Sequence, residues 1–150
     1  MLLPKSSPWH AISKLVLKRG GHFVEMVEDE EFAETLLRRG EYRPTTDVAW
    51  FDAGEPLACV KNASEAAQRI PSATIHIGLG LHYADGAGGG IYWCRHTYLT
   101  VPRLGARGGR AIYEVTVGPW GYYGFLATPS DWRFWVHYAG GTLADEQMGR

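Results

Sequence analysis

Residues 74–82 read Thr-Ile-His-Ile-Gly-Leu-Gly-Leu-His, and apolar residues occupy every second position. A period of two places these apolar residues on one face, as in a half-buried β-strand: Ile75, Ile77, Leu79 and Leu81. In residues 55–70 the apolar spacing is instead helical, and Pro71 separates the two patterns. The chain therefore changes from helix to strand at this proline.

The C-terminal side of this boundary is predicted to be mostly strands. Aromatic and β-branched residues are frequent in three further segments, at 91–101, 110–117 and 121–127. A short helix is predicted to begin at Ser130-Asp131-Trp132, and the polar tail from Gly140 is expected to be loose.

The N-terminal side is predicted to be mostly helical. One helix starts with Ser7 as the cap and Pro8 at the first helical position. A second covers residues 29–39, with acidic residues at its start and basic residues at its end. Residues 41–54 are interpreted as a loop. A third helix covers 56–70, with Pro56 at its first position.

This order, helices first and then strands, indicates an α+β fold. We expect a single domain over residues 1–150, because the sequence has no internal repeat and no evident boundary. The prediction is that N-terminal helices and a central helix carrying Cys59 pack on an antiparallel sheet of about four strands.

Composition excludes several classes of protein. The chain is 45% hydrophobic and 21% charged, as in ordinary globular domains, and its net charge of −1 argues against a duplex nucleic acid partner. Two cysteines do not make a disulfide framework, and we expect reduced thiols in a soluble, cytoplasmic protein. No apolar stretch is long enough for a signal peptide or a membrane helix. The oligomeric state stays open.

Cys59 is the first candidate for chemistry. It falls in the first turn of the predicted 56–70 helix, where free backbone N–H groups and the helix dipole stabilise a thiolate. Taken alone, a cysteine near a helix start is more often a small core residue. Cys94 lies inside an apolar strand, so we expect it to be structural and buried.

Two strand residues complete a possible catalytic set. His96 lies on the predicted strand 91–101, and Glu114 interrupts the apolar run of the next strand, where a carboxylate is costly without a partner. Adjacent antiparallel strands would place them side by side, as a base and the group that orients it. Cys59, His96 and Glu114 are therefore the candidate catalytic residues.

The order of these residues resembles the papain-like/transglutaminase-like superfamily of cysteine enzymes. Cys59-Val60-Lys61-Asn62-Ala63 is similar to the Cys-x-x-Asn-Ala helix start of small bacterial and phage members, and Glu114-Val115-Thr116 to their acid-x-Thr. The resemblance covers about residues 50–126. It departs from the pattern at Glu114, where Asp is usual, and at Tyr98, where Trp is commoner.

The resemblance implies a cysteine-nucleophile hydrolase or acyl transferase that acts on an amide or acyl bond of a protein or peptide. Peptidase, deamidase, amidase and transglutaminase-like activities all fit, and none requires a cofactor. Trp50 and Asn62 are the candidate substrate-binding residues. Because no Gln precedes Cys59, the oxyanion hole would consist of backbone N–H groups at the helix start, with a side chain from the Trp50 loop.

Three alternatives stay open. One is a different intracellular transferase whose His76 or His82 face lines a nucleotide pocket, although the sequence has no phosphate-binding loop. A zinc site could use Cys94 and His96 with Cys59 and either His76 or His82, but no paired Cys-x-x-Cys knuckle is present and we expect no metal. The chain could instead be a non-catalytic interaction protein of the phage or mobile-element type that binds a host partner. Reactivity of a single thiol at neutral pH would separate an enzyme from such a protein.

Overall fold

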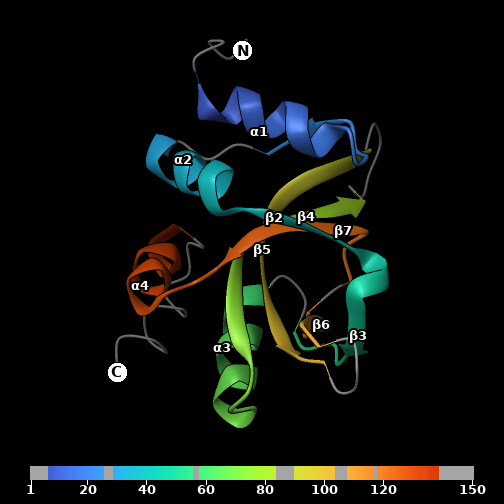
Figure 1. Cartoon of the computed structure of the whole chain (residues 1–150), viewed down its shortest axis with the longest axis vertical. Helices are drawn as coiled ribbons and strands as arrows, with labels where there is room; N and C mark the ends of the chain where they lie inside the picture. Colours follow the sequence, from blue (N-terminus) through green and yellow to red (C-terminus); the bar gives the residue numbers. More distant parts are fainter. Residues whose placement is uncertain are drawn as a thin grey trace.

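The computed structural model describes residues 7–25, 29–55, 58–83, 90–103, 108–116 and 118–138. Over these residues the fold is mixed α+β, with four α-helices packed around one curled sheet (Figure 1). The predicted tail from Gly140 lies outside the described residues.

The two N-terminal helices begin at the predicted caps. In α1 (Pro8–Leu17) the Ser7 hydroxyl accepts a hydrogen bond from the Trp9 N–H. In α2 (Glu30–Arg39) the Asp29 carboxylate accepts one from the Phe32 N–H. Both caps satisfy backbone donors that a helix start leaves free. Figure 1 shows the two helices together at one end of the molecule.

The sheet contains the four predicted strands as β4 (Thr74–Tyr83), β5 (Ile91–Pro102), β6 (Arg110–Glu114) and β7 (Gly121–Leu126). The expectation of about four strands is imprecise, because three short strands extend the sheet: β1 (Phe23–Val24), β2 (Glu41–Pro44) and β3 (Val48–Phe51). The main strand order is β2-β7-β4-β5-β6-β3, and β1 pairs with the start of β5.

The prediction of a loop at residues 41–54 is therefore wrong. β2 and β3 are four residues each, and they form because β7 and β6, far away in the sequence, supply their hydrogen-bonding partners. Such short, mostly exposed segments lack the alternation of apolar and polar residues from which a strand is predicted.

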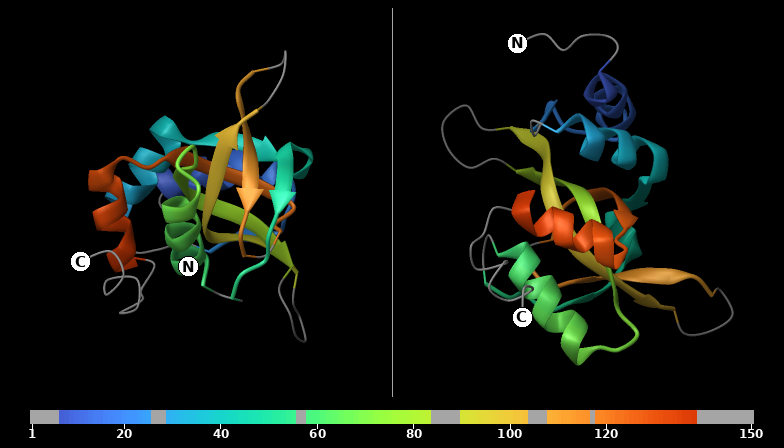
Figure 2. Two further views of the ribbon diagram at one scale, coloured as in Figure 1. Left: turned by 90° about the horizontal axis from the view of Figure 1, so that it is seen from below. Right: turned by 90° about the vertical axis from the view of Figure 1, so that its left-hand side faces the viewer.

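The sheet curls back on itself. β2 and β3 stand at opposite ends of the strand order, yet only a 3₁₀ turn (Thr45–Asp47) joins them. Its Asp47 carboxylate binds the guanidinium groups of Arg43 and Arg103, and Arg43 also donates to the Arg110 carbonyl oxygen. These contacts fasten the two ends of the sheet together, and the strong curvature is visible in Figure 2.

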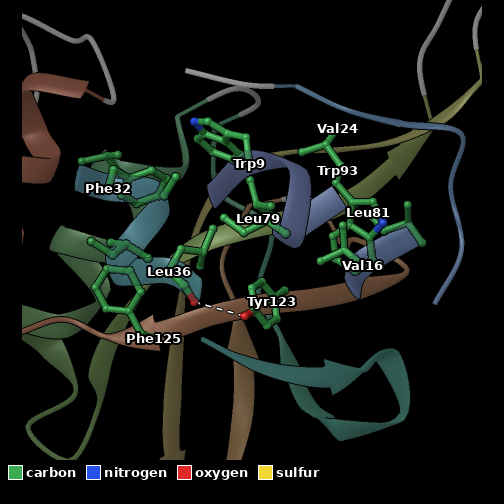
Figure 3. Packing of buried hydrophobic residues seen from close by; sticks show 14 of the residues in the cluster. Trp9, Val16, Val24, Phe32, Leu36, Leu79, Leu81, Trp93, Tyr123 and Phe125 are labelled. Atoms are coloured by element: carbon green, nitrogen blue, oxygen red, sulfur yellow. Dashed lines mark hydrogen bonds between the residues drawn. The ribbon is translucent and has the colours of Figure 1, made fainter. Parts of the chain in front are cut away.

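The outer side of the curled sheet holds the main hydrophobic core, under α1 and α2 (Figure 3). Leu36 and Phe32 of α2 pack there with Leu79 of β4. The Tyr123 hydroxyl donates a hydrogen bond of 3.1 Å to the Leu36 carbonyl oxygen, which ties β7 to α2. The C-cap of α2 is Gly40, and a Cβ at this position would lie 2.3 Å from that same oxygen, which favours glycine there.

The inner side of β4 is covered as well, so the strand is buried on both faces over most of its length and not half-buried as predicted. Its inner positions carry glycines, and a Cβ on Gly78 would lie 2.2 Å from the Tyr123 carbonyl oxygen. A Cβ on Gly80 would instead meet the side chains of His82 and His96, while Tyr98 and Tyr122 pack against each other in a second buried cluster.

Helix α3 (Cys59–Arg69) packs mainly on β5, and its Ala63 and Ala66 form a buried cluster with Leu99 and Val115. It begins at Cys59, three residues later than predicted, and Pro56 lies outside the described residues. Helix α4 (Pro129–Tyr138) follows β7. In the described part of the chain, no helix has the length and apolar character needed to cross a membrane.

Candidate active site

Cys59 lies at a gap along one edge of β5. On the edge away from β4, β1 pairs with residues 92–93 and β6 with residues 99–102, and no described strand pairs with the stretch between them. The backbone after β3 continues beside β6, with Asp52 N–H donating to the Glu114 carbonyl oxygen. This path brings the first residue of α3 to the gap.

The Cys59 sulfur has hydrogen-bonding partners on β5. The His96 ring and both the backbone and the hydroxyl of Thr97 hydrogen-bond to it. Burial alone would raise the pKa of the thiol, but the bond to His96, its charge and the Thr97 donors together lower this pKa below its ordinary value. The residue is partly buried, whereas His96 and Glu114 are buried.

His96 links the sulfur to a carboxylate. Its Nε2 lies 2.7 Å from Oε1 of Glu114, which leaves Nδ1 for the sulfur. Burial alone would lower the pKa of the imidazole, but the charge of Glu114 and the bonds to Cys59 and Glu114 raise it well above its ordinary value. These two opposite shifts favour a thiolate–imidazolium pair at neutral pH.

Glu114 is completely buried and has four hydrogen-bond donors. Oε1 accepts from His96 and, at 2.9 Å, from the Tyr122 hydroxyl, and Oε2 accepts from the backbone N–H groups of Val115 and Thr116 at 3.0 and 3.3 Å. These bonds offset the cost of placing a carboxylate in the interior. The structure thus brings the three predicted residues into one chain of contacts.

Tyr122 was not predicted as a site residue. It lies on β7, which is not adjacent to β6 in the sheet, and reaches Glu114 only because the sheet curls. The sequence signal available was the aromatic run Gly121-Tyr122-Tyr123-Gly124, which gives no direction for either ring. Thr97 was also missed, since its contact with Cys59 depends on the gap in the edge of β5.

Asn62, predicted to bind substrate, is engaged by the protein itself. Its Nδ2 donates to the Glu55 carbonyl oxygen at 2.8 Å and to the Thr116 hydroxyl at 3.0 Å, while its Oδ1 accepts from the Glu55 N–H at 3.3 Å. These bonds fix the turn before α3 and join it to the end of β6. The side chain is thus placed to hold the start of the Cys59 helix.

Trp50, the other predicted substrate-binding residue, lies on β3. It is 42% exposed, and its ring stacks on Tyr113 with 6.2 Å between centroids. Tyr113 packs with the cluster under α3. None of the described contacts joins Trp50 to Cys59, His96 or Glu114. The structure therefore does not bring Trp50 together with the catalytic candidates.

His82 is a further neighbour of His96. The two rings meet edge-on at 5.2 Å, because His82 leans over Gly80, where a Cβ would lie 2.8 Å from its Nε2. Burial, followed by the positive charge of His96, lowers the pKa of His82 to about 4. His82 is therefore neutral at physiological pH.

Cys94 is partly exposed and not buried as predicted. Burial and the charge of Glu25 nevertheless raise the pKa of its thiol to about 11, so its environment is unlike that of Cys59. For the zinc alternative, the described residues contain no group of three or more His, Cys, Asp or Glu side chains arranged to hold a metal ion.

Comparisons of the chain with models of protein families, with curated proteins and with solved structures give no match.

Proposed function

We propose that the protein is a cysteine-nucleophile hydrolase or acyl transferase that acts on an amide or related acyl bond. The observation that carries this proposal is the buried His96, whose ring is shared between the Cys59 sulfur and the Glu114 carboxylate. A base held between a nucleophile and an orienting acid is the arrangement that activates such nucleophiles. The same order of residues supports membership of the papain-like/transglutaminase-like superfamily.

In the first half of the reaction, the Cys59 thiolate attacks the carbonyl carbon and the negative charge moves to the carbonyl oxygen. The N–H groups of Cys59 and Val60, which precede the first helical hydrogen bond of α3, are donors for that charge. When the C–N bond breaks, the leaving amine takes the proton of His96. The acyl group remains on the sulfur as a thioester.

In the second half, neutral His96 accepts a proton from water or from another nucleophile as it attacks the thioester. The thiolate leaves, and the thiolate–imidazolium pair is restored without a cofactor. Glu114 keeps Nε2 of His96 bonded throughout, so Nδ1 remains the nitrogen that faces the reacting groups. The substrate class we propose is a protein or peptide amide.

The test is formation and turnover of an acyl-enzyme with an activated ester, p-nitrophenyl acetate. We expect p-nitrophenol release beyond one equivalent and an acetyl group on the peptide that contains Cys59. Cys59→Ala should abolish both results, His96→Gln should slow them, and Cys94→Ser should leave them intact.

Labelling that is absent from Cys59, or that proceeds equally well in His96→Gln, would contradict the proposal. A folded protein without any acyl-enzyme would instead favour the non-catalytic interaction protein. Thermal unfolding of each variant shows whether the loss reflects chemistry or folding.

A further inference from the structure

The Tyr122 side chain is fully buried on the inner face of β7, in a cluster with Tyr98 and Ile112. Its hydroxyl donates a hydrogen bond of 2.9 Å to Oε1 of Glu114. The same oxygen lies 2.7 Å from Nε2 of His96. Oε1 is therefore the atom at which side chains from β5, β6 and β7 meet.

The Tyr122 hydroxyl acts as the donor in this bond. A carboxylate has lone pairs but no hydrogen to give, so the hydrogen between the two groups belongs to the phenol. Burial, followed by the charge of Glu114 and the hydrogen bond to it, raises the pKa of Tyr122 above its ordinary value of 10.0. The phenol therefore keeps its hydrogen over the whole pH range in which Cys59 and His96 share a proton.

The two oxygens of Glu114 are held in different ways. Oε2 accepts from the backbone N–H groups of Val115 and Thr116, which side-chain substitutions leave in place. Among the described residues, the donors to Oε1 are the side chains of His96 and Tyr122. A hydrogen bond to the charged form of an acid favours that form, whereas burial disfavours it. The Tyr122 hydroxyl therefore favours a charged Glu114 at the oxygen that faces His96.

We propose that Tyr122 is a positioning residue, whose hydroxyl keeps the Glu114 carboxylate charged and its Oε1 aimed at Nε2 of His96. This inference rests on the proposed function, in which Glu114 orients His96 and His96 activates Cys59. Without the hydroxyl, the Nε2 proton of His96 can pass to Oε1, because burial favours two neutral groups over a charged pair that has lost a donor. The imidazole then loses the charge that stabilises the thiolate.

Removal of the hydroxyl alone tests this role. Tyr122→Phe keeps the ring and removes the donor. The matched control is Tyr123→Phe, which also loses a buried hydroxyl bond, of 3.1 Å to the Leu36 carbonyl oxygen, but in the core on the opposite face of β7. The full chain carrying Cys94→Ser is treated with iodoacetamide over a range of pH, and alkylation of Cys59 is followed by mass spectrometry. Thermal unfolding monitors the fold of each protein.

For Tyr122→Phe we expect the midpoint of the alkylation profile to move to higher pH by about one unit. Tyr123→Phe should lose stability without moving the midpoint. Added to Glu114→Gln, Tyr122→Phe should cause no further shift, because Tyr122 acts through the carboxylate. A fluorinated tyrosine at position 122, which is a stronger donor of nearly the same shape, should move the midpoint to lower pH.

A Tyr122→Phe profile with the parent midpoint would overturn the inference, even if this variant were less stable. So would an equal shift in the Glu114→Gln background, because Tyr122 would then act by another route. If Tyr122→Phe does not fold, the fluorinated tyrosine decides, and an unmoved midpoint contradicts the inference. Failure of the proposed function looks different, because the parent protein would then show slow alkylation that does not change in His96→Gln, and both proposals would fall.

Discussion

At the scale of a single residue, the environment of Glu114 matches what its place in the sequence predicts. A carboxylate in an apolar strand predicts a partner, and the structure gives it four donors and no solvent exposure. Members of the superfamily that the sequence resembles usually have Asp at this position, which is one methylene shorter. The longer side chain of Glu114 fits because it folds back and accepts hydrogen bonds from the N–H groups of the next two residues, Val115 and Thr116. The longer acid therefore fits this sheet.

Glu114→Gln should test the orienting role most directly. The amide can donate where His96 needs an acceptor, so the imidazole would favour the wrong tautomer. We expect turnover to fall by at least tenfold, and by up to about 10⁴-fold as in serine enzymes. Turnover of the activated ester across a range of pH is the measurement. An unchanged pH profile would remove Glu114 from the mechanism and leave at most a Cys–His dyad.

The identities of the three central residues could be predicted from residue type and order alone. Their neighbours could not, because Thr97 and Tyr122 acquire their roles from the gap in β5 and from the curl of the sheet. For Asn62 the sequence predicted that it shares a helix face with Cys59, but not which groups its side-chain amide bonds. The backbone of Glu55, to which the amide is hydrogen-bonded, precedes the helix and carries no signal in the residue pattern.

At the scale of elements, the start of α3 has an unusual construction. Its N-cap residue, Ala58, has no side-chain capping bond, and Asn62 from the next turn holds the preceding backbone instead. The position of the Cys59 helix therefore depends on a side chain outside the cap position.

Asn62→Ala should destabilise the fold by about 1–3 kcal/mol, because the Glu55 carbonyl oxygen and the buried Thr116 hydroxyl would lose a partner. We also expect Cys59 alkylation at neutral pH to slow. Urea unfolding and alkylation measure the two effects, and Gln68→Ala, at an exposed position of the same helix, is the control. Stability equal to that of the control would show that these bonds do not anchor the helix.

The glycines of β4 form the second element-scale feature. A Cβ on Gly80 would lie 2.8 Å from His82 Nε2 and 3.2 Å from His96 Cβ, so Gly80→Ala must displace one of the two rings. We expect a loss of about 1–3 kcal/mol of stability and slower Cys59 alkylation. Gly118→Ala, where a Cβ would make only an ordinary contact of 3.6 Å with Phe51, is the matched control. Equal effects of the two substitutions would contradict this packing.

At the scale of the whole molecule, the closure of the sheet is the feature that could not be predicted from the sequence. The strands that close it are short, and their partners are set by distant residues such as Arg43 and Asp47 meeting Arg103 and Arg110. The longer strands and the capped helices were predicted, because each carries its own periodicity or cap. The interior that encloses the site follows from the closure and so could not be predicted.

The buried histidines make overall stability depend on pH. Burial, then the charges of Arg43 and Arg110, lower the pKa of His76 to about 4, and His82 is shifted in the same direction. Below an ordinary histidine pKa of 6.5 the unfolded chain therefore binds more protons than the folded chain. Stability should fall as the pH decreases from about 6.5 to about 4, by up to about 3 kcal/mol from His76.

The Cys59–His96 pair adds a distinct pattern. Between the ordinary pKa values of 6.5 and 9.0, the two shifts act in opposite directions: the raised pKa of His96 makes stability fall as the pH increases, and the lowered pKa of Cys59 makes it rise. Above about 9, His96 keeps a proton after the unfolded thiol has lost its own, and stability should fall. Urea unfolding at a series of pH values is the measurement, and His76→Phe should flatten the acid slope. An acid slope unchanged in His76→Phe would refute this assignment.

Titration of the thiolate by its ultraviolet absorbance shows whether His96 holds Cys59 as a thiolate. In the full chain carrying Cys94→Ser, the thiolate should persist well below the ordinary cysteine pKa of 9.0, and His96→Gln should return its formation to about 9.0 or above. A thiolate that forms only at 9.0 or above in the protein with His96 intact would contradict the account. So would a titration that His96→Gln leaves unchanged.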